Sequence, residues 1–240
     1  MKTTLRWTLS AGLVLASGVT GLGHAEAADS SEISPAITIH VHNYAEVAPK
    51  TLAEAEGVAT EIFRKAGVQT RWADRVLTAD SNPENPAAHP DFTLADIQVS
   101  IFPRVMYEPA SLPKNVMGVA PGNGPDRQIV YMFESNIEAR YWKLLSARSS
   151  GRMDRRVSKA QILGHVMAHE VGHLLLNQEV HSAHGIMRGE WDITDFRDMT
   201  GGMLVFSPQQ AENLRADVLR RNAQPKTINV FRLESAALGH

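Results

Sequence analysis

The chain is organised around the stretch His169-Glu170-Val171-Gly172-His173. Apolar residues flank this stretch on both sides, with Val166 and Met167 before it and Leu174 and Leu175 after it. On a helix, a step of four residues is one turn plus about 40°, so the two histidine rings project from one face. The pattern therefore predicts a largely buried helix that carries two imidazoles side by side.

Two imidazoles on one helical face are suited to hold a single metal ion. Their nitrogens can converge at the ~2.0–2.1 Å that zinc requires. Glu170 adjoins the first histidine, where it can hold a water beside the metal and accept its proton. We therefore expect zinc as the cofactor, His169 and His173 as ligands, and Glu170 as the general base of a hydrolysis.

A catalytic zinc site needs a third protein ligand and one open position. Glu179, His181 and His184 follow the helix and are the candidates. A carboxylate is an acceptable zinc ligand, so the residue types alone leave the choice open. His165 lies one turn before His169, and three histidines on successive turns span about 12 Å, too far for one ion. We expect His165 to be structural.

From His169 to Met187 the sequence resembles the metzincin metallopeptidases, whose helix pattern H-E-x-x-H-x-x-G-x-x-H is followed by a methionine turn. The stretch HSAHGIM, which begins at His181, is similar to the matrixin end of that motif. The resemblance implies peptide-bond hydrolysis, and it implies that Met187 forms the methionine turn beneath the zinc. Met199 and Met203 are rivals for that place.

The chain departs from the family pattern at two positions. Leu176 stands where the family has glycine, and Glu179 stands where it has the third histidine. Asn177 is, after glycine, the residue best suited to the left-handed position that ends a helix. We infer that the helix ends one residue later, that the returning loop is longer, and that His181 is the third ligand, with Glu179 and His184 as alternatives.

The helix has a clear start, and other elements can be placed around it. Ser158-Lys159-Ala160-Gln161 is a capping box, which predicts a helix from there to about Leu176. Alternating or continuous apolar runs predict strands at 37–41, 68–72, 97–102, 115–120 and 128–133. Capping signals predict further helices at 51–66, opened by Thr51 and Glu54, at 135–148, opened by Ser135, and at 207–222, opened by Ser207 and Pro208.

This order of elements predicts an α/β (α+β) fold, a mixed twisted sheet with helices packed on it. By the resemblance it is metzincin-like or zincin-like, with an active-site helix, a C-terminal helix and an antiparallel edge strand near the cleft. We expect a peptide or protein substrate to bind extended along that edge, near 116–120, by strand addition. His40 and His42 alternate with the apolar positions of the first strand, so we expect them to face solvent.

The N-terminus has the composition of a signal peptide. Lys2 and Arg6 are basic, an apolar and small-residue stretch follows from 7 to 21, and Ala25-Glu26-Ala27 fits a cleavage site. We predict a signal peptide at 1–27 and a single zincin-like catalytic domain at 28–240, exported to the periplasm or secreted. The apolar stretch is too short for a spanning helix, so no membrane association is expected after its removal.

Composition excludes several other classes of protein. The 240 residues are 43% apolar, which allows a sizeable core. The net charge is -2 with scattered lysines and arginines, so no nucleic-acid partner is expected. There is no cysteine, which excludes disulfides and thiolate ligands.

Three functions remain open at this point. The favoured one is an exported zinc endopeptidase. The others are a non-catalytic zinc-binding or interaction module on the same fold, and a zinc amidase that acts on cell-wall peptides. The intact Glu170 argues against the non-catalytic module, because a pure binding site has no use for a base beside an open coordination position.

Overall fold

The computed structural model describes residues 34–74, 93–104, 115–122, 124–149, 157–177 and 181–223. The predicted signal peptide at 1–27 and the candidate ligand Glu179 lie outside these ranges. Within them, no helix has both the length and the apolar composition needed to cross a bilayer.

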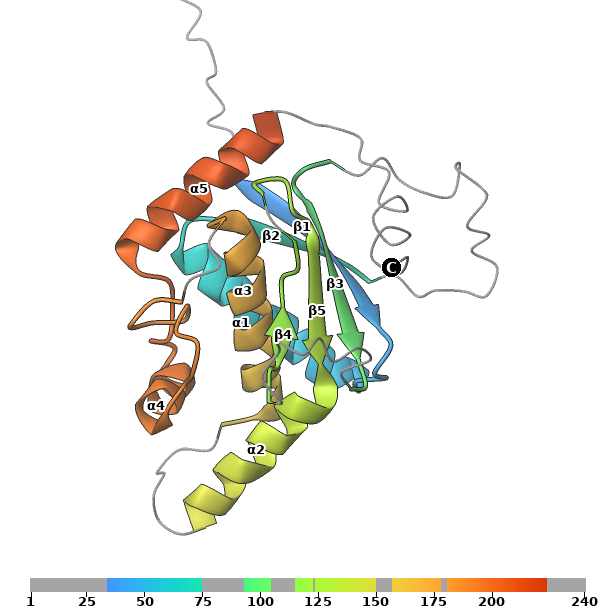
Figure 1. The fold of residues 1–240 in the computed structure, drawn as a ribbon, viewed down its shortest axis with the longest axis vertical. Helices are drawn as coiled ribbons and strands as arrows, with labels where there is room; N and C mark the ends of the chain where they lie inside the picture. The colour runs from blue at the N-terminus through green and yellow to red at the C-terminus, as the bar shows by residue number, and fades with distance from the viewer. Residues whose placement is uncertain are drawn as a thin grey trace, which may run out of the picture. The chain divides into compact units, whose positions relative to one another are not determined.

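Five strands form one mixed sheet in the order β2-β1-β3-β5-β4 (Figure 1). They are β1 (Ala36–Asn43), β2 (Gln69–Asp74), β3 (Asp96–Phe102), β4 (Gly118–Val119) and β5 (Ile129–Phe133). β1, β2, β3 and β5 are parallel, whereas the edge strand β4 pairs antiparallel with β5. The predicted mixed sheet with an antiparallel edge strand is thus confirmed, although β4 is shorter than the expected 115–120.

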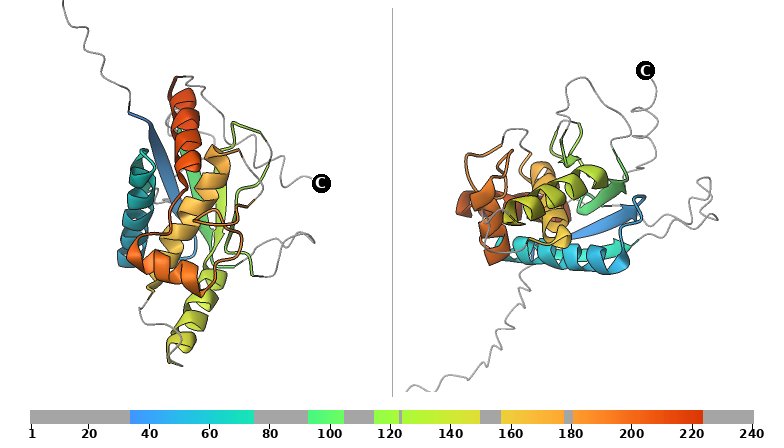
Figure 2. Two further views of the ribbon diagram at one scale, coloured as in Figure 1. Left: turned by 90° about the vertical axis from the view of Figure 1, so that its left-hand side faces the viewer. Right: turned by 90° about the horizontal axis from the view of Figure 1, so that it is seen from below.

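Five helices accompany this sheet in the described part of the chain. They are α1 (Pro49–Lys65), α2 (Glu134–Ser149), α3 (Lys159–Leu175), α4 (Ile193–Gly201) and α5 (Pro208–Ala223). Figures 1 and 2 show α1 and α3 side by side against the sheet, with α5 near the end of α3 and near β1. The helix with the two histidines is α3, so the candidate site lies on the central helix of the fold.

The core lies between the sheet and the helix pair α1 and α3. Alternate residues of the two central strands are at most 2% exposed: Ile37, Ile39, Val41, Ile97, Val99 and Ile101. Every residue from Ile162 to Leu175 is buried as well. Gly164 allows the close approach of the two helices, because a Cβ there would lie only 2.4 Å from the carbonyl oxygen of Ala55. Burial of one large apolar side chain stabilises by about 1.5–3 kcal/mol, so α3 is held rigidly.

Two predicted helix starts were wrong, and one helix was missed. The helix α1 begins at Pro49 rather than at a Thr51 cap, because a proline in the first turn has the right φ and needs no partner for an N–H. The helix α2 begins at Glu134, directly after β5 and before the expected cap Ser135. The helix α4 was not predicted at all.

The prediction that His40 and His42 face solvent was also wrong, since each is only 7% exposed. The Nε2 of His40 lies 2.8 Å from a carboxylate oxygen of Asp96, and the ring of His42 stacks on Tyr44. Burial raises the pKa of Asp96, but hydrogen bonds from His40 and Thr93 outweigh it and hold the pKa below its usual range. His40 and Asp96 are therefore paired with each other on this face of the sheet.

Candidate metal centre

The caps at the two ends of α3 set the position of its histidines. At the start, Ser158 Oγ accepts a hydrogen bond from the Gln161 amide, and Gln161 Oε1 accepts one from the Ser158 amide, both at 3.0 Å. At the other end Leu176 is the C-cap, and Asn177 follows with a φ of 48°. The predicted capping box and the predicted left-handed asparagine are both confirmed, so the chain leaves the helix one residue after the family pattern would.

Three imidazoles converge just beyond this helix end. The Nε2 of His173 lies 3.1 Å from the Nε2 of His169 and 3.3 Å from the Nε2 of His181. One nitrogen from each ring lies within 4.8 Å of the other two. Three nitrogens bound at ~2.0–2.1 Å to one tetrahedral ion stand about 3.3 Å apart, so the residues present fit a zinc ion.

Of the three candidates for the third position, the structure brings His181 to the pair on α3. His184 is exposed and is not part of the cluster in the described residues. Glu179 lies outside the described ranges. Gly189 packs directly against the His181 ring. A Cβ at that position would lie only 2.9 Å from Cγ of the ring.

The return loop that carries His181 is stabilised by backbone hydrogen bonds. The Ser182 amide donates to Met187 O at 2.9 Å, and the Ile186 amide donates to Val205 O at 3.1 Å. Gly185 has a φ of 74°, in the left-handed region that favours glycine. These bonds turn the chain back under α3.

His169 is oriented by that same loop. Its Nδ1–H donates to Ile186 O at 2.7 Å, and the indole N–H of Trp191 donates to the same carbonyl at 3.2 Å. Burial, with a further contribution from His173, lowers the pKa of His169 to about 3. The ring is therefore neutral at pH 7 with its Nε2 lone pair toward the cluster, as a metal ligand must be.

Met187 lies directly beneath the metal-bearing turn of α3. It is 1% exposed, and its Sδ lies 2.8 Å from the position that a Cβ on Gly172 would take. The rivals lie elsewhere, since Met203 is 71% exposed and Met199 is buried in α4, where it lines a separate cavity. Of the three methionines, the structure brings Met187 to the place expected for the methionine turn.

Glu170 is buried beside the triad under the edge strand. A Cβ on Gly118 of β4 would lie 2.6 Å from Cγ of Glu170 and 2.9 Å from its Oε1. Burial raises the pKa of Glu170 to about 8. A carboxyl group with a pKa near neutrality can both accept and donate a proton, and a cation at the three imidazoles would favour its charged form.

No protein-family model matches the chain. No curated protein matches it. Solved structures are similar to it, among them the following two.

The first is a zinc-dependent peptidase from Methanocorpusculum labreanum (strain Z), at 13% identity and a TM-score of 0.45, covering 73% of this chain and 99% of its own. The second is archaemetzincin from Methanopyrus kandleri, at 11% identity and a TM-score of 0.45, covering 79% of this chain and 99% of its own. At such low similarity the case for function rests on this chain's own residues.

The triad and Glu170 open into a cleft of about 580 Å³. The edge-strand segment 115–120 forms one wall, and residues 188–191 of the loop before α4 form the other. Figure 1 shows α3 between β4 and the α4 region. His169, His173 and His181 all line the cleft. The edge strand β4 and the candidate metal centre therefore border the same cleft.

Sequence reasoning missed Trp191, which closes the inner side of the centre. Its ring is 7% exposed and meets His169 edge to face at a centroid distance of 5.7 Å. It meets His165 in the same way at 6.3 Å. In the sequence, a single tryptophan in a polar loop soon after Met187 could have indicated a buried residue beside the site.

His165 has the structural role that was predicted. It is 3% exposed, and its Nδ1–H donates to Gln161 O at 2.7 Å. Burial lowers its pKa to about 4, so the ring is neutral at neutral pH. It stays outside the metal cluster of the described residues.

Two arginines, also missed, satisfy the carbonyl groups at the end of α3. Arg127 donates to His173 O at 2.9 Å, and also to Ala120 O and Gly122 O at 2.9 Å each. The last carbonyls of a helix have no partner within the helix, and a cation there is favourable. Arg127 thus joins the histidine-bearing turn to the loop that follows the edge strand.

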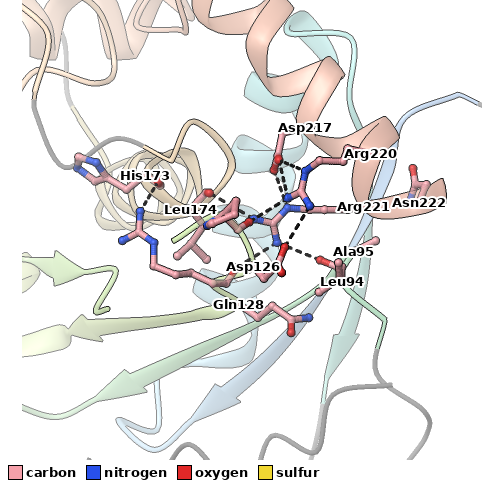
Figure 3. Close-up of polar contacts among 12 residues, drawn as sticks. Leu94, Ala95, Asp126, Gln128, His173, Leu174, Asp217, Arg220, Arg221 and Asn222 are labelled. Carbon is pink, nitrogen blue, oxygen red and sulfur yellow. Dashed lines mark hydrogen bonds and ion pairs between the residues drawn. The ribbon is translucent and has the colours of Figure 1, made fainter. Parts of the chain in front are cut away.

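Arg221 of α5 makes the second connection, shown in Figure 3. Its side chain is fully buried and donates to Leu174 O at 3.3 Å and to Leu94 O at 3.0 Å. It also donates to the carbonyls of Pro125 and Arg127, and pairs with Asp217 at 2.6 Å. One side chain therefore links α5, the end of α3 and the segments that lead into β3 and β5.

Proposed function

We propose that this chain is an exported zinc-dependent endopeptidase with Glu170 as its general base. The observation that carries the proposal is the convergence of His169, His173 and His181 beside the buried Glu170, at the base of a cleft walled by an edge strand. Export rests on the signal-peptide pattern at 1–27.

Zinc held by His169, His173 and His181 would supply a Lewis acid that polarises a carbonyl and lowers the pKa of a water molecule. Glu170 accepts the proton of the attacking water and returns it to the nitrogen of the departing amine. The buried position of its carboxylate under Gly118 keeps bulk water away from that proton.

The edge strand β4 orients the substrate. Its residues line the cleft, and an edge strand offers backbone N–H and C=O groups on its outer side for an extended peptide. Gly118 is required at this place, because any larger side chain would enter the space of the Glu170 carboxylate. The scissile bond is thereby set directly over the base.

Two other functions differ in testable ways. A non-catalytic zinc module would bind metal with or without Glu170 and would turn nothing over. A zinc amidase would use the same residues on cell-wall peptides rather than proteins. The burial of Glu170 beside the cluster favours an enzyme over the module.

The deciding experiment measures zinc content and hydrolysis on the mature protein, residues 28–240. We expect about one zinc per chain in the wild type, lost in His173→Ala and His181→Ala and retained in His184→Ala. Casein and cell-wall fragments are compared as substrates.

The variant Glu170→Gln should keep its zinc and lose turnover by about 10²–10⁴-fold, because the base is gone and the ligands are not. The matched control is Glu190→Gln, an exposed acid of the same cleft that should retain hydrolysis. Equal turnover in wild type and Glu170→Gln would overturn the enzyme proposal. Cleavage of cell-wall fragments without cleavage of casein would favour the amidase.

A further inference from the structure

The cleft contains one arginine whose charge is not matched within the described residues. Arg140 of α2 lines the cleft with the triad and is half-buried. Its Cζ lies 5.9 Å from the centroid of the Phe196 ring. In the described part of the chain it has no hydrogen bond and no ion pair.

The other two arginines of the cleft are engaged. Arg188 pairs with Asp192 at 2.7 Å and with Asp195 at 2.6 Å. Arg127 is occupied by three backbone carbonyls around the end of α3. Arg140 therefore differs from both, because no described residue accepts a hydrogen bond from its five N–H donors.

The acids near Arg140 do not neutralise it either. Glu134 and Glu138, on the same helix, both pair with Lys159. Glu190 lines the same cleft, is exposed, and makes no ion pair with Arg140. The guanidinium is thus a net positive group on the wall of the cleft.

The surroundings of Arg140 have the form of a side-chain subsite. Val166, Trp191 and Arg140 line the cleft together, and Phe196 holds the guanidinium against its ring while meeting Trp191 edge to face at 6.4 Å. Val166 lies one turn before Glu170 on α3, so this region is close to the proposed base. Apolar walls with a fixed guanidinium suit a carboxylate on a short aliphatic stem, which the guanidinium can bind with two parallel hydrogen bonds.

We propose that Arg140 is a specificity-determining residue that binds a carboxylate of the substrate close to the scissile bond. The carboxylate comes from an acidic side chain, which fits an endopeptidase, or from the free C-terminus of the peptide, in which case the same site acts as a carboxypeptidase. This inference rests on the proposed peptidase function and names the substrate class of that same site.

The test compares matched peptides that differ only in a carboxylate. One series replaces glutamine by glutamate at each position that flanks the cleaved bond, and the other compares a free C-terminus with its amide. We expect the wild type to prefer the carboxylate by about tenfold in kcat/KM, the size of one charge-assisted hydrogen-bonded contact. Arg140→Gln should bring the ratio to about one, and Arg140→Glu should make a lysine peptide the preferred one.

The matched control is Lys143→Gln. Lys143 is an exposed cation further along α2 that does not line the cleft, so the carboxylate preference should persist in that variant. An unchanged glutamate-to-glutamine ratio in Arg140→Gln would overturn the proposal, and so would a wild type with no preference in either peptide series. The series that shows the preference identifies the source of the carboxylate.

A second measurement separates this proposal from the peptidase itself. The same peptides are titrated into the zinc-loaded Glu170→Gln variant with and without Arg140→Gln, and binding is followed by calorimetry. Arg140 should strengthen binding of the carboxylate peptide about tenfold over its neutral partner. If the wild type hydrolyses none of the peptides, the peptidase proposal fails, while this binding ratio still decides the role of Arg140.

Discussion

Gly172 lies inside the five-residue motif, at a position that the motif itself leaves open. Met187 Sδ and a ring carbon of Phe206 each lie 2.8 Å from where its Cβ would be. Carbon and sulfur atoms cannot approach so closely, so any side chain would push the return loop away from α3. The glycine is therefore required for packing at a site where the motif specifies only the metal ligands and the base.

We predict that Gly172→Ala destabilises the protein by about 1–3 kcal/mol, because the added methyl overpacks the contact with Met187 and Phe206. The control is Gly57→Ala on α1, where a Cβ meets nothing within 4 Å. That change should stabilise by about 0.5–1 kcal/mol through helix propensity. Denaturant unfolding measures both, and a stable Gly172→Ala variant would show that the return loop adapts.

The buried His165 makes stability depend on pH. Burial lowers its folded-state pKa to about 4 from an ordinary value of 6.5, so the unfolded chain binds the proton first as pH falls. This contribution to stability is complete above about pH 6.5 and is lost as the pH falls toward 4. Between pH 7 and pH 5 it amounts to about 2 kcal/mol.

The variant His165→Asn cannot titrate, yet its side chain can still donate to Gln161 O. We predict that wild type loses about 2 kcal/mol more than His165→Asn between pH 7 and pH 5, measured by denaturant unfolding. Loss of metal at low pH affects both proteins alike and cancels in the difference. Parallel stability curves would mean that His165 does not keep a depressed pKa.

Some residues of the site could be placed from the sequence, and others could not. His169 and His173 were found because a spacing of four has one geometric meaning on a helix. His40 and His42 were misplaced because strand alternation assigns residues to two faces but does not tell whether the second face is covered. Arg127 and Arg140 were missed because their meaning depends on partners distant in the sequence.

At the scale of elements, the end of α3 decides where the third histidine falls. Asn177, with a φ of 48°, turns the chain out of the helix and toward the loop that carries His181. The left-handed conformation costs an ordinary L-residue about 1–2 kcal/mol and costs a β-branched residue at least as much. The helix end and the metal site are therefore coupled through one backbone conformation.

We predict that Asn177→Val destabilises by about 1–2 kcal/mol and also weakens zinc affinity, because the return loop loses its fixed starting direction. Glu46 is the matched control, since it has a φ of 52° in the connection between β1 and α1. Glu46→Val should lower stability by a similar amount and leave zinc affinity unchanged. Competition with a chromophoric chelator measures the affinity, and equal affinity in all three proteins would uncouple the helix end from the site.

The helix α4 shows how an element can escape prediction despite good local signals. Its N-terminus has a capping box between Asp192 and Asp195, and Gly202 ends it in the left-handed conformation. Within this short helix only Asp195, Phe196 and Met199 are buried, so no apolar stripe reveals the period. By contrast, α3 and α5 were predicted because their caps precede long segments of helix-forming residues.

At the scale of the whole molecule, Arg221 connects α3 to segments that are distant from it in the sequence. It is fully buried and serves four carbonyls and one carboxylate. We predict that Arg221→Ala destabilises by about 3–5 kcal/mol, because it leaves Asp217 and those carbonyls without their buried cation.

The matched control for this prediction is the neighbouring Arg220→Ala. Arg220 is 34% exposed and pairs with Asp126 and Asp217, so its loss should cost no more than about 1 kcal/mol. Thermal and denaturant unfolding compare the two variants. Similar losses in both would mean that burial of Arg221 adds nothing to an ordinary surface ion pair.

The position of Arg221 along the chain also bears on the order in which the protein is made. In a growing chain, α3 with its histidines is synthesised well before α5. The carbonyl of Leu174 therefore has no hydrogen bond from Arg221 until α5 has been made. During that interval the C-terminal end of α3 lacks one of the hydrogen bonds that it has in the finished protein. The C-terminal end of α3 therefore gains its contact with Arg221 only after α5 has been synthesised.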